Sequence, residues 1–294
     1  MKIVITGSLG NISKPLAEEL IQKGHLVTVI SSNPDKQKDI EALGAKAAIG
    51  KLEDIGFLTA AFSGADAVYA MIPPDFAAPD LIARYQTIGG CYAQAIEQSG
   101  VKKVVQLSSW GAHLPEGTGV ITGSYHVEQI FNQLKNVDIT YLRPTSFYYN
   151  LFHYIDMIKT AGFIGTNFGG NDKVAMVSPV DIAAAAAEEL EISTTGRKIR
   201  YIASDDRTCN EVAAVLGAAI GKPDLQWKLF TDEQTGIALE SNGISPYIAN
   251  LLVELNTAIH SGAMREDYDQ HQPVMGKVKL EDFAKEFAAV YHQK

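Results

Sequence analysis

The sequence predicts an α/β protein in which a doubly wound parallel sheet is followed by a smaller, mostly helical C-terminal lobe. Short, almost wholly apolar runs alternate with helical patterns from residue 2 to about residue 150. These runs carry too few polar residues for strands with one solvated face, so helices must cover both faces of the sheet. The alternation loosens after Asn150. We therefore expect a sheet domain over residues 1–150 and a lobe over 151–294, with part of the lobe, about 172–203, returning to the sheet.

The alternation begins with a strand, a turn, a helix and a second strand. Residues 2–6 form an apolar run, and residues 14–23 place apolar side chains at helical spacing behind Pro15, which a first helical turn tolerates. Gly24 ends that helix, and the β-branched run at 26–30 completes a β-α-β unit. The pattern continues with strands at 45–50, 67–72, 103–107 and 139–142 and with helices at about 58–62, 81–99 and 125–134.

The C-terminal lobe shows fewer regular patterns. Residues 198–202 form its one clear strand, and Thr208 with Glu211 makes a capping pattern ahead of a helix that ends at Gly221. Aromatic residues gather at 147–154. They either line a flat slot for a planar acceptor or pack the lobe, and we expect packing for most and ligand contact for one or two.

The composition of the chain indicates which kind of molecule it binds. The 294 residues are 46% hydrophobic and 20% charged, which is typical of a globular protein. Lys and Arg number 25 and Asp and Glu 34, so the net charge of 25 − 34 = −9 argues against a general nucleic-acid or anionic-membrane binder. We expect a small-molecule partner.

The cysteine count and the start of the chain indicate a reducing compartment. Cys91 and Cys209 lie far apart and have no clustered Cys or His beside them, so neither a disulfide framework nor a metal site is predicted. The chain enters a strand pattern at once, without a secretory signal, and no apolar run is long enough to cross a membrane. We expect a soluble cytoplasmic protein, either a monomer or a homodimer.

The turn between the first strand and the first helix carries the clearest chemistry. It reads Thr6-Gly7-Ser8-Leu9-Gly10-Asn11-Ile12-Ser13. At this place backbone N–H groups and the helix dipole converge on a diphosphate. Gly7 permits the tight turn, Gly10 lets the backbone approach the phosphates, and Ser13 stands where a third glycine usually allows close packing. We predict that Gly7, Ser8, Gly10, Asn11 and Ile12 bind a dinucleotide.

The end of the second strand indicates which dinucleotide is bound. An acidic side chain there holds the ribose 2′-hydroxyl of NAD, whereas a basic one accepts the 2′-phosphate of NADP. Here Ser31, Ser32 and Asn33 offer no acid and Lys36 lies close by, so NADP is favoured, with NAD possible. We predict that these four residues bind the cofactor; the alternative for Lys36 is a solvated loop. The ends of the next two strands would flank adenine and ribose through Leu52, Met71, Ile72 and Pro73.

These motifs together resemble the NmrA-like family of atypical short-chain dehydrogenase/reductases, which includes NADPH-quinone reductases and NmrA-type regulators. The residues that carry the resemblance are Thr6-Gly7-x-x-Gly10, Ser108-Ser109, the segment 141–147 with Asn150, and the segment 180–183. The resemblance covers nearly the whole chain. It implies a Rossmann-type fold and a cofactor site that includes Ser108, Pro144 and Phe147.

Two positions depart from the family pattern. NADP-binding members commonly carry an arginine where this chain has Ser32. Reductases of the wider superfamily use Tyr-x-x-x-Lys, in which the lysine ammonium lowers the pKa of the tyrosine, but here Tyr125 is followed by Gln129, which carries no charge. We therefore do not expect Tyr125 to act as the usual proton relay, although it remains a candidate.

Two further side chains are catalytic candidates. His126 is a candidate proton donor, and the alternative is that it only hydrogen-bonds in a first helical turn. Ser109 either contacts a substrate carbonyl or caps the next turn. Arg143, before Pro144, is expected to fix its loop through an ion pair.

The favoured function is an NAD(P)-binding oxidoreductase that passes hydride from NADPH to a quinone or similar conjugated carbonyl. The alternative is a non-enzymatic NAD(P) redox sensor that binds a protein partner, which the missing lysine favours. A sugar-nucleotide epimerase is disfavoured because it would also need the Tyr/Lys pair.

Overall fold

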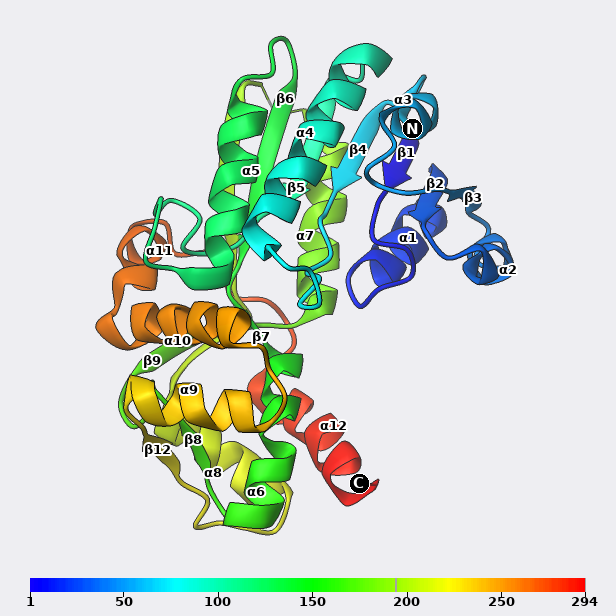
Figure 1. The fold of residues 1–294 in the computed structure, drawn as a ribbon. Coiled ribbons are helices and arrows are strands. Elements are labelled where there is room, and N and C mark those ends of the chain that lie inside the picture. Colours follow the sequence, from blue (N-terminus) through cyan, green and yellow to red (C-terminus); the bar gives the residue numbers. More distant parts are fainter. Residues whose placement is uncertain (194, 294) are drawn as a thin grey trace. The chain divides into compact units, whose positions relative to one another are not determined.

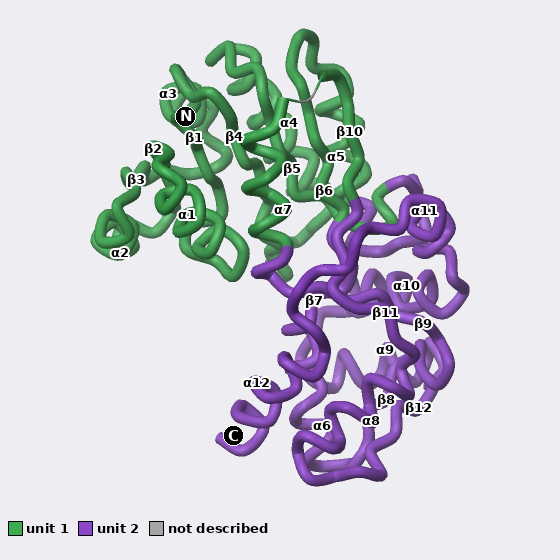
Figure 2. The backbone as a smooth tube through the Cα atoms, turned by 180° about the vertical axis from the view of Figure 1, so that it is seen from behind, with its two compact units in different colours: residues 1–112, 123–143, 182–200 green, residues 113–122, 144–181, 201–294 purple. Residues whose placement is uncertain are grey.

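The chain divides into two compact units (Figures 1 and 2). The computed structural model describes residues 1–193 and 195–293. The first unit contains residues 1–112, 123–143 and 182–200, and the second contains residues 113–122, 144–181 and 201–294. Each unit therefore draws on three separate stretches of the chain. The domain boundary predicted at residue 150 stays a prediction.

The first unit is built on a seven-stranded sheet, counted over the described residues, with the order β10-β6-β5-β4-β1-β2-β3. Its strands are β1 (Lys2–Ile5), β2 (Leu26–Ser31), β3 (Lys46–Ile49), β4 (Ala67–Ala70), β5 (Lys103–Leu107), β6 (Asp138–Pro144) and β10 (Arg197–Ile202). The pairings from β3 across to β6 are all parallel. The strand predicted at 198–202 is β10, at the β6 edge of this sheet. The predicted doubly wound parallel fold is confirmed.

Helices cover both faces of this sheet (Figures 1 and 2). They are α1 (Ser13–Gln22), η1 (Pro34–Lys36), α2 (Gln37–Ala42), α3 (Ile55–Phe62), α4 (Leu81–Ser99), α5 (Thr122–Asn132) and α7 (Pro179–Glu191). Local chemistry sets several ends: Asp54 and Asp80 accept the N–H groups of the first turns of α3 and α4, each at 2.9 Å. Gly100 ends α4 in the left-handed conformation, with φ of 74°.

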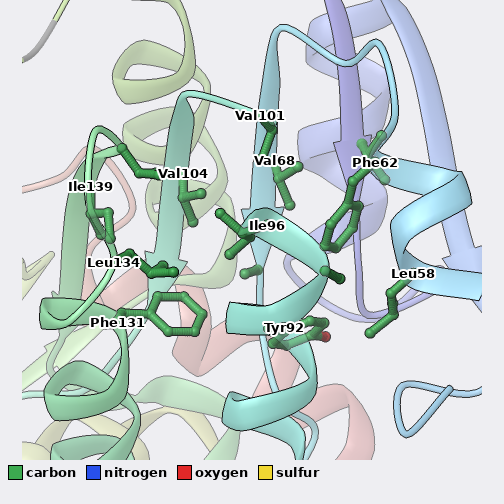
Figure 3. Packing of buried hydrophobic residues seen from close by; sticks show 14 of the residues in the cluster. Leu58, Phe62, Val68, Tyr92, Ile96, Val101, Val104, Phe131, Leu134 and Ile139 are labelled. Carbon is green, nitrogen blue, oxygen red and sulfur yellow. The ribbon is translucent and has the colours of Figure 1, made fainter. Parts of the chain in front are cut away.

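One apolar cluster joins the sheet to α3, α4 and α5 (Figure 3). Phe62 from α3, Tyr92 and Ile96 from α4, and Phe131 from α5 are fully buried against valines of β4 and β5. Burying whole aromatic and aliphatic side chains is the main favourable contribution to folding. This cluster therefore fixes the helices whose N-terminal ends meet the carboxyl edge of the sheet.

The second unit combines short strands with helices. Its strands are β7 (Ser146–Phe147), β8 (Ile164–Thr166), β9 (Lys173–Val177), β11 (Asp205–Thr208) and β12 (Trp227–Leu229), which form sheets of order β11-β9-β7 and β12-β8. Its helices are η2 (Gly119–Ile121), η3 (Tyr148–Tyr154), α6 (Ile155–Ala161), α8 (Cys209–Ala219), α9 (Asp232–Ser241), α10 (Pro246–Ser261), η4 (Ala263–Arg265), α11 (Glu266–Gln270) and α12 (Leu280–Gln293). The lobe is mostly helical, as expected, but its short strands were not predicted from the sequence.

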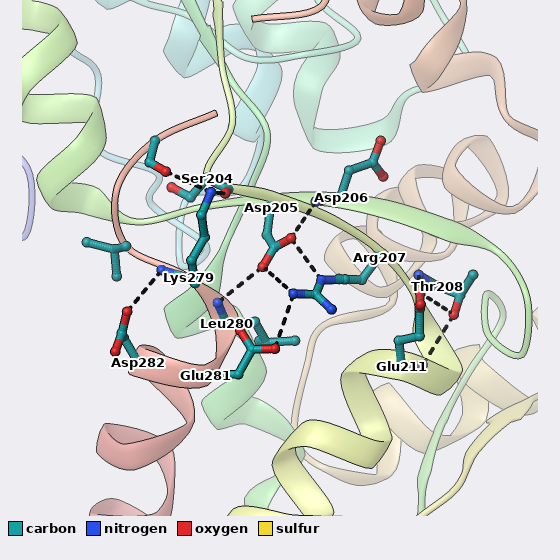
Figure 4. A network of polar contacts seen from close by, with 12 residues as sticks. Ser204, Asp205, Asp206, Arg207, Thr208, Glu211, Lys279, Leu280, Glu281 and Asp282 are labelled. Carbon is teal, nitrogen blue, oxygen red and sulfur yellow. Dashed lines mark hydrogen bonds and ion pairs between the residues drawn. The ribbon is translucent and has the colours of Figure 1, made fainter. Parts of the chain in front are cut away.

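Aromatic stacking and a polar network contribute to the packing of the second unit. Tyr148 stacks on Phe283 with ring centroids 5.3 Å apart, and Phe152 stacks on Phe287 at 5.9 Å, so these aromatics pack the lobe. In the network of Figure 4, the carboxylate of Asp205 accepts from Arg207 at 2.8 Å and from the Leu280 N–H at 3.3 Å. Burial alone would raise the pKa of Asp205, but these hydrogen bonds outweigh it, and the pKa lies below its ordinary value.

The capping pattern predicted in this unit is present. Thr208 accepts the Glu211 N–H, and the Glu211 carboxylate accepts the Thr208 N–H, at the start of α8. No helix in the described ranges is both long enough and apolar enough to cross a membrane.

Phe131→Ala is expected to destabilise the protein by about 3–5 kcal/mol, because it deletes a fully buried ring between α5 and the sheet. Urea denaturation followed by circular dichroism measures the loss. Phe76→Ala is the matched control, since that ring is 51% exposed and its removal should change the free energy of unfolding by less than about 0.5 kcal/mol. Equal losses in the two variants would contradict the assigned packing.

Candidate functional site

The turn between β1 and α1 has an unusual backbone conformation. Gly7 has φ of 93° and Ser8 has φ of 55°, two successive residues in the left-handed region. The Ser8 N–H donates to the Ile30 carbonyl at 3.0 Å, and the Gly10 N–H donates to the Gly7 carbonyl at 3.1 Å. The turn is thus fixed both internally and to the end of β2.

Gly7 is required here for space as well as for its conformation. A Cβ added to Gly7 would lie 2.6 Å from the Ser13 Oγ and 2.8 Å from the Met71 Sδ. Ser13 is buried, and its hydroxyl donates to the Thr6 carbonyl at 2.9 Å. The small side chain predicted at the third glycine position therefore fits, and it adds a hydrogen bond that ties α1 to the end of β1.

The outer part of the turn offers unoccupied backbone donors. Gly10 and Asn11 are exposed, and within the described part of the chain the N–H groups of Leu9, Asn11 and Ile12 form no hydrogen bond. These donors precede the N-terminus of the ten-residue helix α1, where the dipole favours an anion. A diphosphate fits this arrangement, because it brings negative charge and several acceptor oxygens to one exposed turn.

Met71 lies beside the turn because β4 pairs with β1. The Thr6 hydroxyl bonds both backbone groups of Met71. The Met71 N–H donates to the Thr6 Oγ1 at 2.8 Å, and that hydroxyl donates to the Met71 carbonyl at 3.1 Å. The hydroxyl of Tyr92 donates to the same carbonyl at 2.8 Å, and burial raises the pKa of this tyrosine. In a doubly wound sheet, ligands bind where the strand order reverses, which here is between β1 and β4.

The end of β2 carries a polar loop. Ser31 is buried, and its hydroxyl accepts from the Ser8 hydroxyl at 2.9 Å. Asn33 caps η1 by accepting the Asp35 N–H at 2.9 Å. Ser32 is exposed. Lys36 is also exposed, and its Nζ forms an ion pair with the Asp39 Oδ2 at 3.2 Å. The remaining predicted contacts lie at the same edge: Leu52 packs on the apolar cluster, Ile72 is buried, and Pro73 is exposed.

A buried charge cluster joins the ends of β5 and β6 to α5. The Ser108 hydroxyl donates to Glu128 Oε1 at 2.5 Å, and Arg143 donates to the two Glu128 oxygens at 3.0 and 2.7 Å. The side chains of Glu128 and Arg143 are each 4% exposed. Removing one member of a buried pair leaves an uncompensated charge, so the cluster holds α5 firmly in place. The ion pair expected for Arg143 is present.

The candidate catalytic residues lie in the first turns of α5 and at the end of β5. The rings of Tyr125 and His126 meet edge to face with centroids 5.4 Å apart, and both side chains are partly buried. Ser109 follows Ser108 and is also partly buried. Gln129 is exposed. This part of the unit thus presents an imidazole and a phenol side by side.

Pro144 and Phe147 belong to the second unit, at the end of β6 and in β7. Pro144 is buried, and Phe147 lies against Tyr149 with ring centroids 5.1 Å apart. Their assignment to the cofactor site stays a prediction.

Comparison with known proteins decides the family. A model described as NAD(P)H-binding matches residues 7–192, which is more than half of the chain. The chain belongs to the NAD(P)H-binding family. The match confirms the resemblance to the atypical short-chain dehydrogenase/reductases and the prediction of a nicotinamide dinucleotide, at the level of NAD(P)H.

Similar proteins cover between 75% and 98% of this chain. An NAD(P)H azoreductase from Xenophilus azovorans is 26% identical over 98% of this chain and 99% of its own. A (4-alkanoyl-5-oxo-2,5-dihydrofuran-3-yl)methyl phosphate reductase from Streptomyces griseus subsp. griseus is 26% identical over 75% of this chain and 74% of its own. An NADPH-dependent quinone oxidoreductase from Escherichia coli shares the fold with a TM-score of 0.84 at 20% identity, covering 97% of this chain and 99% of its own.

Several contacts that support the β1–α1 turn were not found from the sequence. The hydroxyls of Thr6 and Tyr92 that hold Met71 gave no separate signal, since they act on a backbone far along the chain. Thr6 was visible only as the residue before Gly7. The Ser8–Ser31 hydrogen bond was likewise hidden, although both residues were singled out for cofactor binding.

Gly10→Val is expected to abolish NADPH binding by this protein, because a branched side chain would occupy the exposed surface that the diphosphate must approach. A Cβ at Gly10 meets only the Gly7 carbonyl, at 3.1 Å, so the variant should stay folded. Fluorescence titration with NADPH and a thermal melt measure the two properties. Gly90→Val is the matched control, since nothing lies within 4 Å of a Cβ added there. Unchanged NADPH affinity in folded Gly10→Val would reject the site.

Proposed function

We propose that the protein is a reductase that passes hydride from NADPH to a quinone or a similar conjugated carbonyl. The observation that carries the proposal is the β1–α1 turn, whose left-handed backbone, exposed glycine and unoccupied N–H groups fit a diphosphate. The reduced nicotinamide supplies the hydride when it is bound. The protein supplies binding, orientation and control of the proton.

The names of the relatives support a conjugated acceptor. An azo group is a conjugated N=N bond, and a 4-alkanoyl-5-oxo-2,5-dihydrofuran carries two carbonyls on one ring double bond. Quinones have the same character, since hydride addition places the charge on oxygens that share it through the ring. Such acceptors need less help from a strong acid than an isolated ketone does.

The residues at the start of α5 suit this chemistry. Hydride addition to a quinone yields a hydroquinone anion, and one proton then completes the hydroquinone. In this proposal His126, whose ring lies against that of Tyr125, supplies that proton and regains one from water. Tyr125 lies beside it as a hydrogen-bonding partner for the acceptor, and Ser109 at the end of β5 is a second donor. The Glu128–Arg143 pair fixes the helix that carries Tyr125 and His126.

We expect the protein to bind NADPH more tightly than NADH and to oxidise NADPH when a quinone is added. No acid stands at the end of β2, whereas Ser32 and Asn33 are exposed polar residues there and Lys36, paired with Asp39, adds positive charge. Fluorescence titration with both cofactors, followed by absorbance at 340 nm with a series of quinones, tests both statements. Equal affinities would reject the preference, and tight binding without turnover on any acceptor would reject the reductase.

That last outcome would support the second candidate function, a redox sensor that binds a protein partner. Its specific support is the exposed Gln129, which stands where the superfamily reductases carry a lysine. A sensor would change its protein contacts between NADP⁺ and NADPH. A reductase would turn over a conjugated acceptor in the purified state, so the same experiment separates the two.

Tyr125→Phe is expected to lower quinone reduction by far less than the ~10²–10⁴-fold that follows loss of a positioned acid or base. The variant keeps the ring against His126 and deletes only the hydroxyl. His126→Ala is the comparison, and its loss should be the larger of the two. Steady-state rates at saturating NADPH measure both. If the Phe variant lost activity by that full factor with intact NADPH affinity, Tyr125 would be the proton donor.

A further inference from the structure

We propose that Ser31 is a positioning residue for cofactor selection, which acts by joining the β1–α1 turn to the loop that follows β2. Its hydroxyl would fix the spacing between the two segments that hold the diphosphate and the adenosine ribose. This inference rests on the proposed dinucleotide site at Gly7–Ile12 and does not depend on which acceptor is reduced.

The hydroxyl of Ser31 is a buried junction. The residue is only 3% exposed, and its oxygen accepts from the Ser8 hydroxyl at 2.9 Å and from the Asn33 N–H at 3.2 Å. The same hydroxyl donates to the Asn33 carbonyl at 3.3 Å. One donated and two accepted hydrogen bonds use its full capacity, so it has no donor left for a ligand.

The backbone of Ser31 adds a third connection. Its carbonyl accepts the Gly50 N–H at 3.0 Å, at the end of β3. The segments that follow β1, β2 and β3 therefore meet at one residue. All three lie at the carboxyl edge of the sheet, where a dinucleotide would extend from its diphosphate to its adenosine.

Ser8 is the residue of the turn that is attached to the end of β2. Its φ of 55° is a conformation that residues other than glycine seldom adopt. Its N–H also donates to the carbonyl of Ile30, directly before Ser31. The Ser8 side chain and backbone thus both attach the turn to the end of β2, and the hydroxyl pair fixes the direction of the Ser8 side chain.

Holding both segments before the ligand arrives lowers the entropic cost of binding. This spacing should matter more for a cofactor with a 2′-phosphate than for one without it, because only that group would use the exposed polar residues Ser32 and Asn33 at a fixed distance from the diphosphate. Losing the hydroxyl pair should therefore weaken NADPH binding more than NADH binding. Ser31, predicted from the sequence as a cofactor contact, would instead control this choice by fixing the turn against the loop.

The experiment compares dissociation constants for NADPH and NADH, measured by fluorescence titration, in Ser31→Ala, Ser8→Gly and the double variant. A net hydrogen bond is worth roughly fivefold in affinity, so each single variant should lose about five- to tenfold for NADPH and about twofold or less for NADH. Because both variants break the same contact, the double variant should be no weaker than Ser31→Ala.

Ser8→Gly and Ser99→Ala distinguish loss of the Ser8–Ser31 contact from misfolding. Glycine accepts the conformation of Ser8 without strain, so Ser8→Gly tests the junction even where Ser31→Ala does not fold. Ser99→Ala is the matched control, since it removes a hydroxyl that donates to the Ile96 carbonyl at the far end of α4. Its affinities should equal those of the parent protein.

The outcomes separate this inference from the proposed site. If Gly10→Val binds NADPH normally, the proposed dinucleotide site is wrong and the inference falls with it. If Gly10→Val loses binding while Ser31→Ala and Ser8→Gly match Ser99→Ala, only the inference is wrong. Equal losses for NADPH and NADH, or additive losses in the double variant, would also overturn it.

Discussion

The parallel pairing of β1 with β4 is the constraint on which the candidate site depends. The chain places β2 and β3 on one side of β1 and then crosses to put β4 on the other. The helices that follow β1 and β4 must leave in opposite directions, which opens the carboxyl edge at this point. Thr6 reinforces the pairing, because its N–H donates to the Tyr69 carbonyl and its hydroxyl engages both backbone groups of Met71.

Local chemistry made most of the first unit predictable. The strands of the large sheet are apolar runs, and the residues that turn the chain between them follow simple steric rules. The short strands of the second unit were not predictable on the same basis. Strand β11 reads Asp205-Asp206-Arg207-Thr208, which has no apolar alternation, and it is extended because it pairs with β9. Tertiary pairing overrides local preference in such segments.

The same distinction applies to the site. The glycine turn was recognisable because one short segment supplies its conformation, its donors and its helix dipole. The contacts that support the turn were not, because each joins residues far apart in sequence through groups of no special type. Tyr92 is a buried tyrosine on a long helix, and Ser31 is a serine at a strand end. Their roles depend on which atom they face, and this is settled only by the packed fold.

The interleaving of the two units affects how the chain is made. Strand β6 lies between β5 and β10, but β10 begins only at Arg197, after a long stretch that belongs to the second unit. Helix α7 reaches the first unit equally late. On the ribosome, residues 1–143 therefore emerge with one sheet edge unpaired and without one of the helices that cover the sheet. An open edge of this kind invites pairing with another nascent chain. The first unit is completed only after two stretches of the second, residues 113–122 and 144–181, have been synthesised.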